Sequence, residues 1–463
     1  MKQYEKYKDS GVEWLGEIPE HWTFERMKHI GQVTFSSVDR HELVTEKSVK
    51  VCHYPVAYKN ESVDNNTTFP QGTCTDSEYA NFQLLKGDII LTKDSETAND
   101  IGVPCFVKET IENCVCGYHL AQLRVNEANK INEAYLFRYI QSKNVSSHFE
   151  TSCNGVTRFG LGKPIIENLL LLKPTIQEQQ IIAHYLDHTI STIDILIKEK
   201  SALITKLQEK RKALINEVVT KGLNQNAPMR DSGIEWLGMI PEHWEVKRVG
   251  LNASIVRGGS PRPAGDPRFF NGNYMPWITV KEVTGAIGKY ITQTESYLTV
   301  EGSLNSRIIE PETLLMSNSG ATLGVPKISK IRGCINDGSV AFTSFSDCLV
   351  RDYLMLFFET HTDIYRDEMK GNGQPNLNTE IIKNTPMPTP PIHEQLEIIT
   401  RAEIIKIRID NIISEIQLQL QKLKEYKTAV ISEVVTGKVD VREWKANQPP
   451  TRSAELTSKP KGE

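Results

Sequence analysis

The sequence lacks an apolar run long enough to cross a membrane, because no uninterrupted apolar stretch approaches 18 residues. Its opening residues, MKQYEKYKDSG, contain neither the apolar core of a secretory signal nor the Arg- and Ser-rich character of a transit peptide. We therefore expect a cytoplasmic protein with no membrane partner.

Paired cysteine motifs are also missing. The chain has 8 cysteines and no C-x-x-C pair, and the first half holds most of the thiols. This irregular distribution excludes a regular disulfide or zinc framework and predicts reduced, mostly buried thiols. His184 and His188 have the i, i+4 spacing of helical metal ligands, but the sequence between them lacks the Glu of H-E-x-x-H. We favour a helix surface over a metal site here and expect no metal.

The sequence also shows no catalytic motif. It has no Asn/Asp-Pro-Pro-aromatic segment, which an amino-group methyltransferase would carry. The segment GLGKP at 160–164 lacks the first glycine and the final Ser/Thr of a phosphate-binding loop. We expect no catalytic residues in this chain. The formal net charge of −4 likewise disfavours a free-standing nucleic-acid binder, which would carry an excess of Lys and Arg.

What the sequence does contain is a repeat. The segment DSGVEWLGEIPEHW at 9–22 returns as DSGIEWLGMIPEHW at 231–244, with 12 of 14 positions identical. We call these segments box 1 and box 2. Their aromatic and aliphatic residues surround a proline, which predicts structural docking rather than stacking on a ligand. The docking residues expected are Trp14, Trp22, Trp236 and Trp244.

A second repeat links 174–220 with 390–436 at a constant offset of 216 residues. Apolar residues recur there at spacings of three, four and seven, so each segment predicts a long amphipathic helix that pairs with the other. The expected seam comprises Ile182, Leu186, Ile193, Ile197, Ile204, Leu207, Leu214 and Val218, and Ile398, Ile405, Ile409, Ile412, Ile416, Leu420, Leu423 and Val430. If a pseudo-two-fold axis relates the halves, box 1 packs at the end of the second helix.

Both helices begin with Glu-Gln. Thr175 and Glu178 have the spacing of a capping box, but Pro391 replaces the hydroxyl residue before Glu394. Two interpretations remain open for Glu178–Gln179 and Glu394–Gln395: a contact across the helix pair or with a partner, or an imperfect helix start. The resulting order is box and variable domain (1–174), helix (175–228), box and variable domain (229–391), helix (392–445) and a disordered tail (446–463).

This arrangement resembles the specificity subunit of a Type I restriction–modification system. The similarity rests on the boxes, the P-x-x-x-EQ helix starts and the EVVT helix ends, together with IVRGGSPRP (255–263), MPWITVKEVTG (275–285), LLMSNSGATLGVPKI (314–328) and GNGQPNLN (371–378). In the first variable domain the match is looser. The resemblance implies an α+β fold, with two globular α/β target-recognition domains joined by two long antiparallel helices in a pseudo-two-fold repeat.

The resemblance also implies a role and partners. Each variable domain would read one half of a bipartite, asymmetric target in double-stranded DNA, while the helix pair spaces the domains and docks two methyltransferase subunits. Restriction/translocase subunits would join them, and S-adenosylmethionine, ATP and Mg would bind those partners rather than this chain. A non-catalytic role follows for the chain itself.

Side chains that pair with base edges should lie in the Gly-rich loops of the variable domains. The candidates are Lys93, Arg158, Lys163, Arg257, Arg262, Lys281, Asn318, Gln374 and Asn376. Residues 23–174 carry 16 Lys and Arg against 18 Asp and Glu, and 245–391 carry 15 against 15. Because DNA affinity comes mainly from phosphate neutralisation, the domains should bind weakly without partners. Two alternatives remain: a scaffold with two ligand-binding domains and no DNA role, and a self-contained endonuclease.

Overall fold

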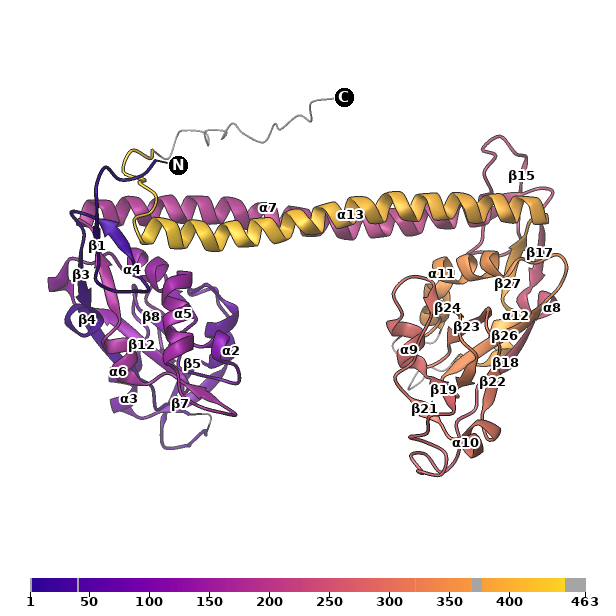
Figure 1. The fold of residues 1–463 in the computed structure, drawn as a ribbon, viewed down its shortest axis with the longest axis horizontal. Coiled ribbons are helices and arrows are strands. Elements are labelled where there is room, and N and C mark those ends of the chain that lie inside the picture. The colour runs from indigo at the N-terminus through magenta and orange to yellow at the C-terminus, as the bar shows by residue number, and fades with distance from the viewer. Residues whose placement is uncertain (1, 40, 321, 369–376, 446–463) are drawn as a thin grey trace. The chain divides into compact units, whose positions relative to one another are not determined.

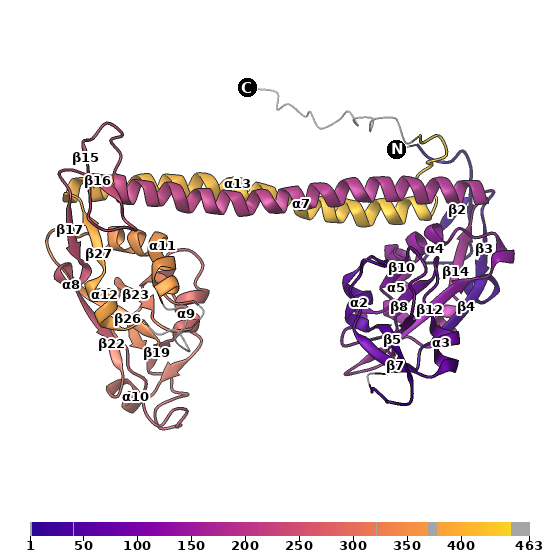
Figure 2. The same ribbon diagram turned by 180° about the vertical axis from the view of Figure 1, so that it is seen from behind.

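A computed structural model describes residues 2–39, 41–320, 322–368 and 377–445 (Figures 1 and 2). The chain forms two compact units. Unit 1 combines the residues up to Lys200 with those from Leu418 onward, and unit 2 comprises Ser201–Gln417. Both long helices pass from one unit into the other, so each unit contains the start of one helix and the end of the other.

The two long helices are α7 (Ile176–Lys221) and α13 (Ile392–Val435). They end seven and ten residues before the ends of the segments 175–228 and 392–445 expected from the sequence. Gly222 and Gly437 follow these ends with φ of +74° and +73°, the left-handed conformation that stops a helix and that glycine adopts without strain. The helices therefore end because of the backbone conformation at these glycines and not because the apolar periodicity stops.

The expected seam is confirmed except at Ile412 and at Leu420, which is only half-buried and packs against neither core. Within unit 1, Ile182, Leu186 and Val430 are buried, and within unit 2 the same holds for Ile398 and Ile409. The prediction for Ile412 is wrong, because 45% of this residue is exposed while its neighbour Ile413 is buried. The seam advances four residues from Ile409 to Ile413, and the sequence offered isoleucine at both positions.

The variable domain of unit 1 is built on a five-stranded sheet whose central strand is β8 (Figure 1). Its order is β4 (Gly31–Phe35), β12 (Leu120–Val125), β8 (Ile89–Thr92), β10 (Pro104–Val107) and β6 (Ser62–Val63). A second sheet has the order β11 (Cys114–Cys116), β5 (Lys47–Cys52) and β7 (Gln71–Cys74). The helices are α1 (Met27–Ile30), α2 (Tyr54–Lys59), α3 (Asp76–Phe82), α4 (Glu133–Ile140), α5 (Lys143–Ser152) and α6 (Lys163–Glu167).

The variable domain of unit 2 repeats this plan. Its five-stranded sheet has the order β18 (Ala253–Arg257), β26 (Ser339–Phe345), β23 (Thr313–Ser317), β24 (Pro326–Ser329) and β20 (Tyr290–Ile291). A second sheet has the order β21 (Tyr297–Leu298), β19 (Met275–Ile278), β25 (Gly333–Ile335) and β22 (Arg307–Ile309). The helices are α8 (Val249–Asn252), α9 (Val280–Gly285), α10 (Val300–Leu304), α11 (Arg351–Glu368) and α12 (Thr379–Asn384).

Short strands complete each unit. The boxes form hairpins, β1 (Tyr7–Asp9) with β2 (Glu17–Pro19) and β15 (Met229–Asp231) with β16 (Met239–Pro241). Each domain is closed by a pair of strands next to a long helix, β3 (Thr23–Arg26) with β14 (Leu170–Lys173) and β17 (Glu245–Arg248) with β27 (Pro386–Thr389). The fold is thus an internal repeat of mixed helix and sheet, as expected from the sequence.

The cysteines are free thiols, and most of them are buried. Burial raises the pKa of Cys105 and of Cys114 to about 12, so these thiols remain protonated at neutral pH. Within the described part of the chain, no helix is long and apolar enough to cross a bilayer.

Candidate functional site

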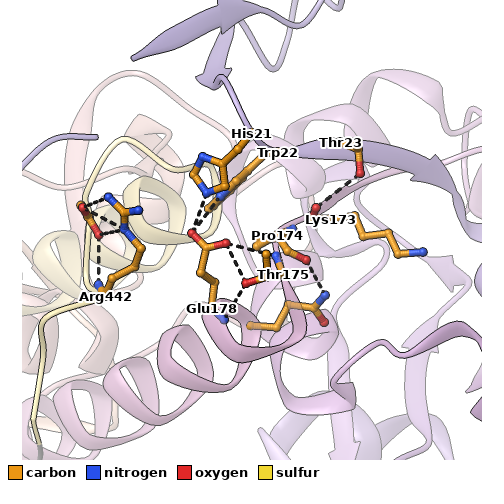
Figure 3. Close-up of polar contacts among 10 residues, drawn as sticks. His21, Trp22, Thr23, Lys173, Pro174, Thr175, Glu178 and Arg442 are labelled. Carbon is orange, nitrogen blue, oxygen red and sulfur yellow. Dashed lines mark hydrogen bonds and ion pairs between the residues drawn. The ribbon is translucent and has the colours of Figure 1, made fainter. Parts of the chain in front are cut away.

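Box 1 is attached to the start of α7 through the carboxylate of Glu178 (Figure 3). His21 Nε2 lies 2.8 Å from Glu178 Oε1, and the buried indole of Trp22 donates to the same oxygen over 3.4 Å. The other oxygen accepts the backbone N–H of Thr175, which completes the expected capping box. Burial opposes ionisation of Glu178, but the hydrogen bonds from His21 and Thr175 outweigh it and lower its pKa.

Box 2 makes the same attachment to α13. His243 Nε2 lies 2.7 Å from Glu394 Oε1, and Trp244 Nε1 donates to Glu394 Oε2 over 2.9 Å. The Glu-Gln pair was predicted to make a contact across the helix pair or with a partner, with an imperfect helix start as the alternative. Neither interpretation anticipated the observed role of Glu394, which holds the box of its own unit.

The glutamines that follow connect each long helix to its variable domain. Gln179 accepts the backbone N–H of Asn132, at the start of α4, over 2.9 Å, and Gln395 accepts that of Val350, at the start of α11, over 2.8 Å. Both amides also donate to the carbonyl of a proline five residues earlier. Because both glutamines are fully buried, these bonds fix the domain on the helix without competition from water.

Each box also contacts the end of the other long helix. A Cβ at Gly437, after α13, would lie 2.5 Å from Pro19 and 3.1 Å from Trp22, so only glycine permits this approach. Tyr7 donates its hydroxyl to the carbonyl of Gly437 over 3.0 Å, and the N–H of Asp440 donates to the carbonyl of Lys2. The predicted docking of box 1 at the end of the second helix is confirmed.

The remaining box tryptophans contact histidines of the domains. Trp14 stacks on His148 of α5 with ring centroids 5.1 Å apart, and Trp236 meets His361 of α11 at 5.2 Å. Gly222 brings the end of α7 against Trp244 in unit 2, where a Cβ would lie 3.0 Å from the indole. Each box therefore joins one helix start, one helix end and one variable domain.

A second site lies in the loops that follow the central strands β8 and β23. In unit 1, Thr92 Oγ1 accepts the N–H of Val103, and the N–H of Gly102 donates to the Thr92 carbonyl over 2.7 Å. In unit 2, the equivalent bonds run from Val325 and from Gly324 to Ser317, the second also over 2.7 Å. The two loops share one backbone scaffold although their sequences differ.

The same scaffold gathers two further loops in each unit. The carbonyl of Lys93 accepts the N–H of Leu161, and the carbonyl of Asn318 accepts that of Leu377. The N–H groups of Lys93 and Asn318 donate to the carbonyls of His119 and Gly338, respectively. The same backbone bonds thus hold different side chains in the two units.

In the first domain, the scaffold brings two of the predicted DNA-contacting residues together. Lys93 Nζ lies 3.0 Å from the Asp94 carboxylate, and His119 Nδ1 lies 2.8 Å from it. Arg158 Nη2 lies 3.1 Å from His119 Nδ1. Lys163 lies at the start of α6 and pairs with Glu167 over 3.5 Å.

In the second domain, Asp337 organises the predicted arginines. Its carbonyl accepts Arg257 Nε and its carboxylate accepts Arg262 Nη2, each over 3.0 Å. Lys281 pairs with Glu295 on the surface. The expectation that Asn318 contacts a base conflicts with its burial, because only 1% of the residue is exposed. Gln374 and Asn376 lie outside the described residues.

Asp94, His119 and Asp337 were not among the predicted residues, because hydrogen-bond donors and amides define that set and the two carboxylates lie behind the donors they orient. One signal was available, since Asp94 directly follows the candidate Lys93. His119 has a φ of +71°, which no sequence pattern predicts. Of the two histidines His184 and His188, His188 packs against Trp444, with ring centroids 5.7 Å apart.

Comparisons with known proteins agree with this repeat. A family model described as the Type I restriction modification DNA specificity domain matches the chain twice, at residues 19–206 and 241–424. A putative type I restriction enzyme MjaX specificity subunit of Methanocaldococcus jannaschii is 24% identical over 440 residues, covering 92% of this chain and 96% of the relative. The MjaVIII specificity subunit of the same organism is 24% identical over 372 residues, covering 77% of this chain and 80% of the relative.

Solved structures share the fold. One chain, from work on complex assembly and conformational transition of the type I R-M system, matches with a TM-score of 0.68 and 15% identity, covering 91% of this chain and 99% of that one. The HsdS subunit from Thermoanaerobacter tengcongensis matches with a TM-score of 0.50 and 14% identity, covering 91% and 98%.

Proposed function

The chain belongs to the Type I restriction modification DNA specificity family, and from this premise we propose how its two units divide the recognition of DNA. Its role is the recognition of a DNA target within a Type I restriction–modification system. In our proposal, residues 23–174 read one half of the target and residues 245–391 read the other. The target is bipartite and asymmetric.

One observation carries this proposal: the loops after β8 and β23 keep the same backbone hydrogen bonds but present different side chains. Asp94 and His119 lie on the scaffold of unit 1, whereas Ser319 and Gly338 occupy the corresponding positions in unit 2. Base edges are distinguished by the donors and acceptors that face them. Two domains with one scaffold and different polar groups should therefore read two different half-sites.

The chemistry of restriction and modification belongs, in this proposal, to partner proteins. Two methyltransferase subunits dock on the chain and bind S-adenosylmethionine, and restriction/translocase subunits bind ATP and Mg. The absence of net positive charge in both variable domains supports this division, because partners must then supply much of the contact with phosphates. Exposed apolar residues on the long helices offer surface for docking, among them Ile195, Leu203, Ile407 and Leu418.

The long helices would set the spacing of the half-sites. At 1.5 Å per residue, the 46 residues of α7 correspond to a rod of about 70 Å. The two helices end on opposite boxes through the same glycine and tryptophan contacts, so their lengths are fixed at both ends.

The decisive experiment exchanges one variable domain. The chain is co-expressed with its methyltransferase partner, and methylated bases are mapped across the host genome before and after residues 23–174 are replaced by the corresponding segment of a related protein. We expect one half-site to change and the other to persist. A change in both halves would contradict independent reading.

Two controls separate the alternatives. The isolated chain should bind its target weakly at physiological salt and gain specific binding when the methyltransferase is added. Incubated with DNA and Mg²⁺ alone, it should leave the DNA intact, whereas cleavage would favour a self-contained endonuclease. A ligand-binding scaffold with no DNA role would leave the methylation pattern independent of this chain.

A further inference from the structure

The loops of unit 1 that carry Asp94, His119 and Arg158, which we call the reading loops, surround a hollow of about 740 Å³. The lining includes Tyr54, Tyr58, Asp94, Tyr118, His119 and Arg158. Asp39, Glu96 and Asp100 also line it, so carboxylates outnumber the cationic side chains. Such a surface repels phosphate and favours groups that donate hydrogen bonds.

Asp94 presents an acceptor to this hollow. Its Oδ2 atom is occupied by Lys93 Nζ at 3.0 Å and by His119 Nδ1 at 2.8 Å. In the part of the chain that the structure describes, Oδ1 accepts no hydrogen bond. Burial opposes ionisation of Asp94, but the bonds from His119 and Lys93 outweigh it and lower its pKa, so the carboxylate is charged at neutral pH.

Arg158 presents donors beside this acceptor. One Nη atom lies 3.1 and 3.2 Å from the two ring nitrogens of His119. Among the described residues, no carboxylate forms an ion pair with Arg158, in contrast to Lys163 and Arg262, which pair with Glu167 and Asp337. The guanidinium therefore retains N–H groups for another partner.

The acceptor and the donors match the two bases of one pair. Asp accepts a hydrogen bond from the N4 amino group of cytosine, and Arg donates two to O6 and N7 of guanine in the major groove. We infer that the half-site read by unit 1 contains a C·G base pair, recognised by Asp94 through cytosine and by Arg158 through guanine. The inference rests on the proposed function and specifies which chemistry the first domain reads.

Lys93 and His119 act as positioning residues in this arrangement. Lys93 is 12% exposed at its side chain, and its ammonium lies between Asp94 and the ring of Tyr118, at 4.9 Å from the centroid. His119 supports both Asp94 and Arg158. Unit 2 has Ser319 at the position of Asp94, while its Asp337 is bonded to Ser260 and Arg262. We therefore expect this recognition of a C·G base pair in unit 1 and not in unit 2.

Methylation mapping with two variants tests the inference. Arg158→Lys keeps the positive charge but loses the paired donors, and Asp94→Asn keeps the shape but adds a donor. In the full complex, Arg158→Lys should reduce discrimination at one C·G position of one half-site by roughly 5- to 150-fold, the range of a single bidentate contact, and Asp94→Asn should reduce discrimination at the same position. The other half-site should not change.

Lys143→Ala is the matched control, because Lys143 lies in the same domain, pairs with Glu150 of α5 over 4.0 Å and does not line the hollow. It should leave the base preference unaltered. A first half-site without any C·G pair would overturn the inference, as would unchanged discrimination in Arg158→Lys, whose exposed side chain does not support the fold. If the unsubstituted chain directs no bipartite methylation, the proposed function itself fails.

Discussion

The carboxylate of Asp194 on α7 lies 2.9 Å from the ammonium of Lys427 on α13, within unit 1. The same relationship recurs in unit 2, where Arg211 of α7 pairs with Asp410 of α13. Asp194 and Asp410 are 216 residues apart, as are Arg211 and Lys427. The internal repeat thus extends from apolar residues to ion pairs, and charge as well as shape fixes the register of the helix pair.

The first prediction concerns this register. We expect Arg211→Asp to destabilise unit 2 modestly and Arg211→Asp with Asp410→Arg to restore it, with a coupling energy of about 0.2–1 kcal/mol for such exposed pairs. Urea unfolding of the two single variants and the double variant gives this coupling. The pair in unit 2 is the better choice, because Lys427 also contacts Glu61. Coupling that does not fall with added salt would argue against an ionic origin.

The second prediction concerns the boxes. Trp22→Ala should cost about 3–5 kcal/mol, because a fully buried aromatic ring is lost between the start of α7 and the end of α13. Trp14→Ala is the matched comparison and should cost less, because Trp14 is only partly buried and stacks on one histidine. The free energy of unfolding by urea decides between them. Equal losses for the two variants would contradict the central position of Trp22.

The third prediction concerns the loss of folding stability at low pH. Burial lowers the pKa of His361 from 6.5 to about 4 in the folded state, while its backbone hydrogen bond to Phe357 opposes this shift. Below about pH 6.5 the unfolded chain therefore binds a proton at His361 that the folded chain does not bind, so stability falls as the pH drops from 6.5 towards 4. The loss reaches about 3 kcal/mol near pH 4.

His361→Phe should flatten this part of the stability profile and retain an aromatic ring beside Trp236. The measurement is the difference in unfolding free energy between the variant and the unsubstituted chain from pH 7 to 4. A constant difference over this range would mean that His361 does not titrate on unfolding.

The fourth prediction follows from the contact between the chain's start and the residues after α13. Asp440 donates to the carbonyl of Lys2, so a short linker can join these segments once residues 446–463 are removed. New ends placed between Gly222 and Pro228 should leave folding intact, because chain ends that lie close together tolerate permutation. Circular dichroism and cooperative unfolding of the permuted chain provide the check. An insoluble product across several linker lengths would contradict the docking of box 1.

Much of this fold could be predicted from the sequence because each repeated segment forms local structure of its own. The apolar spacing of 174–220 and 390–436 gave both long helices, and the duplicated tryptophans gave the docking of the boxes. The position of Ile412 could not be settled, because adjacent isoleucines fit the periodicity equally well. The common topology of the variable domains was also out of reach, since strand pairing such as β6 with β10 joins residues far apart in the chain.

The loops that hold Asp94, His119 and Arg158 were only partly predictable. Glycine and polar residues made Arg158 a candidate, and the structure places it beside His119. Burial was not predictable for Asn318, because its position depends on the carbonyl of Gly338 and the N–H of Leu377, which lie on other loops. The contact between Asp94 and His119 joins residues 25 positions apart, and His119 has a left-handed backbone, so the sequence did not predict it.

Unit 1 takes its last element from residues beyond Leu418, and this has a consequence for synthesis on the ribosome. Unit 2 is continuous and can fold as soon as Gln417 emerges. The first variable domain is made earlier, but it lacks the part of α13 that shares a core with Leu186 and Ile190. At roughly 5–20 residues per second, it waits on the order of 10 to 50 seconds for that segment. The first half of the chain, although synthesised first, is completed last, and during this interval the apolar face of its helix lacks its partner segment.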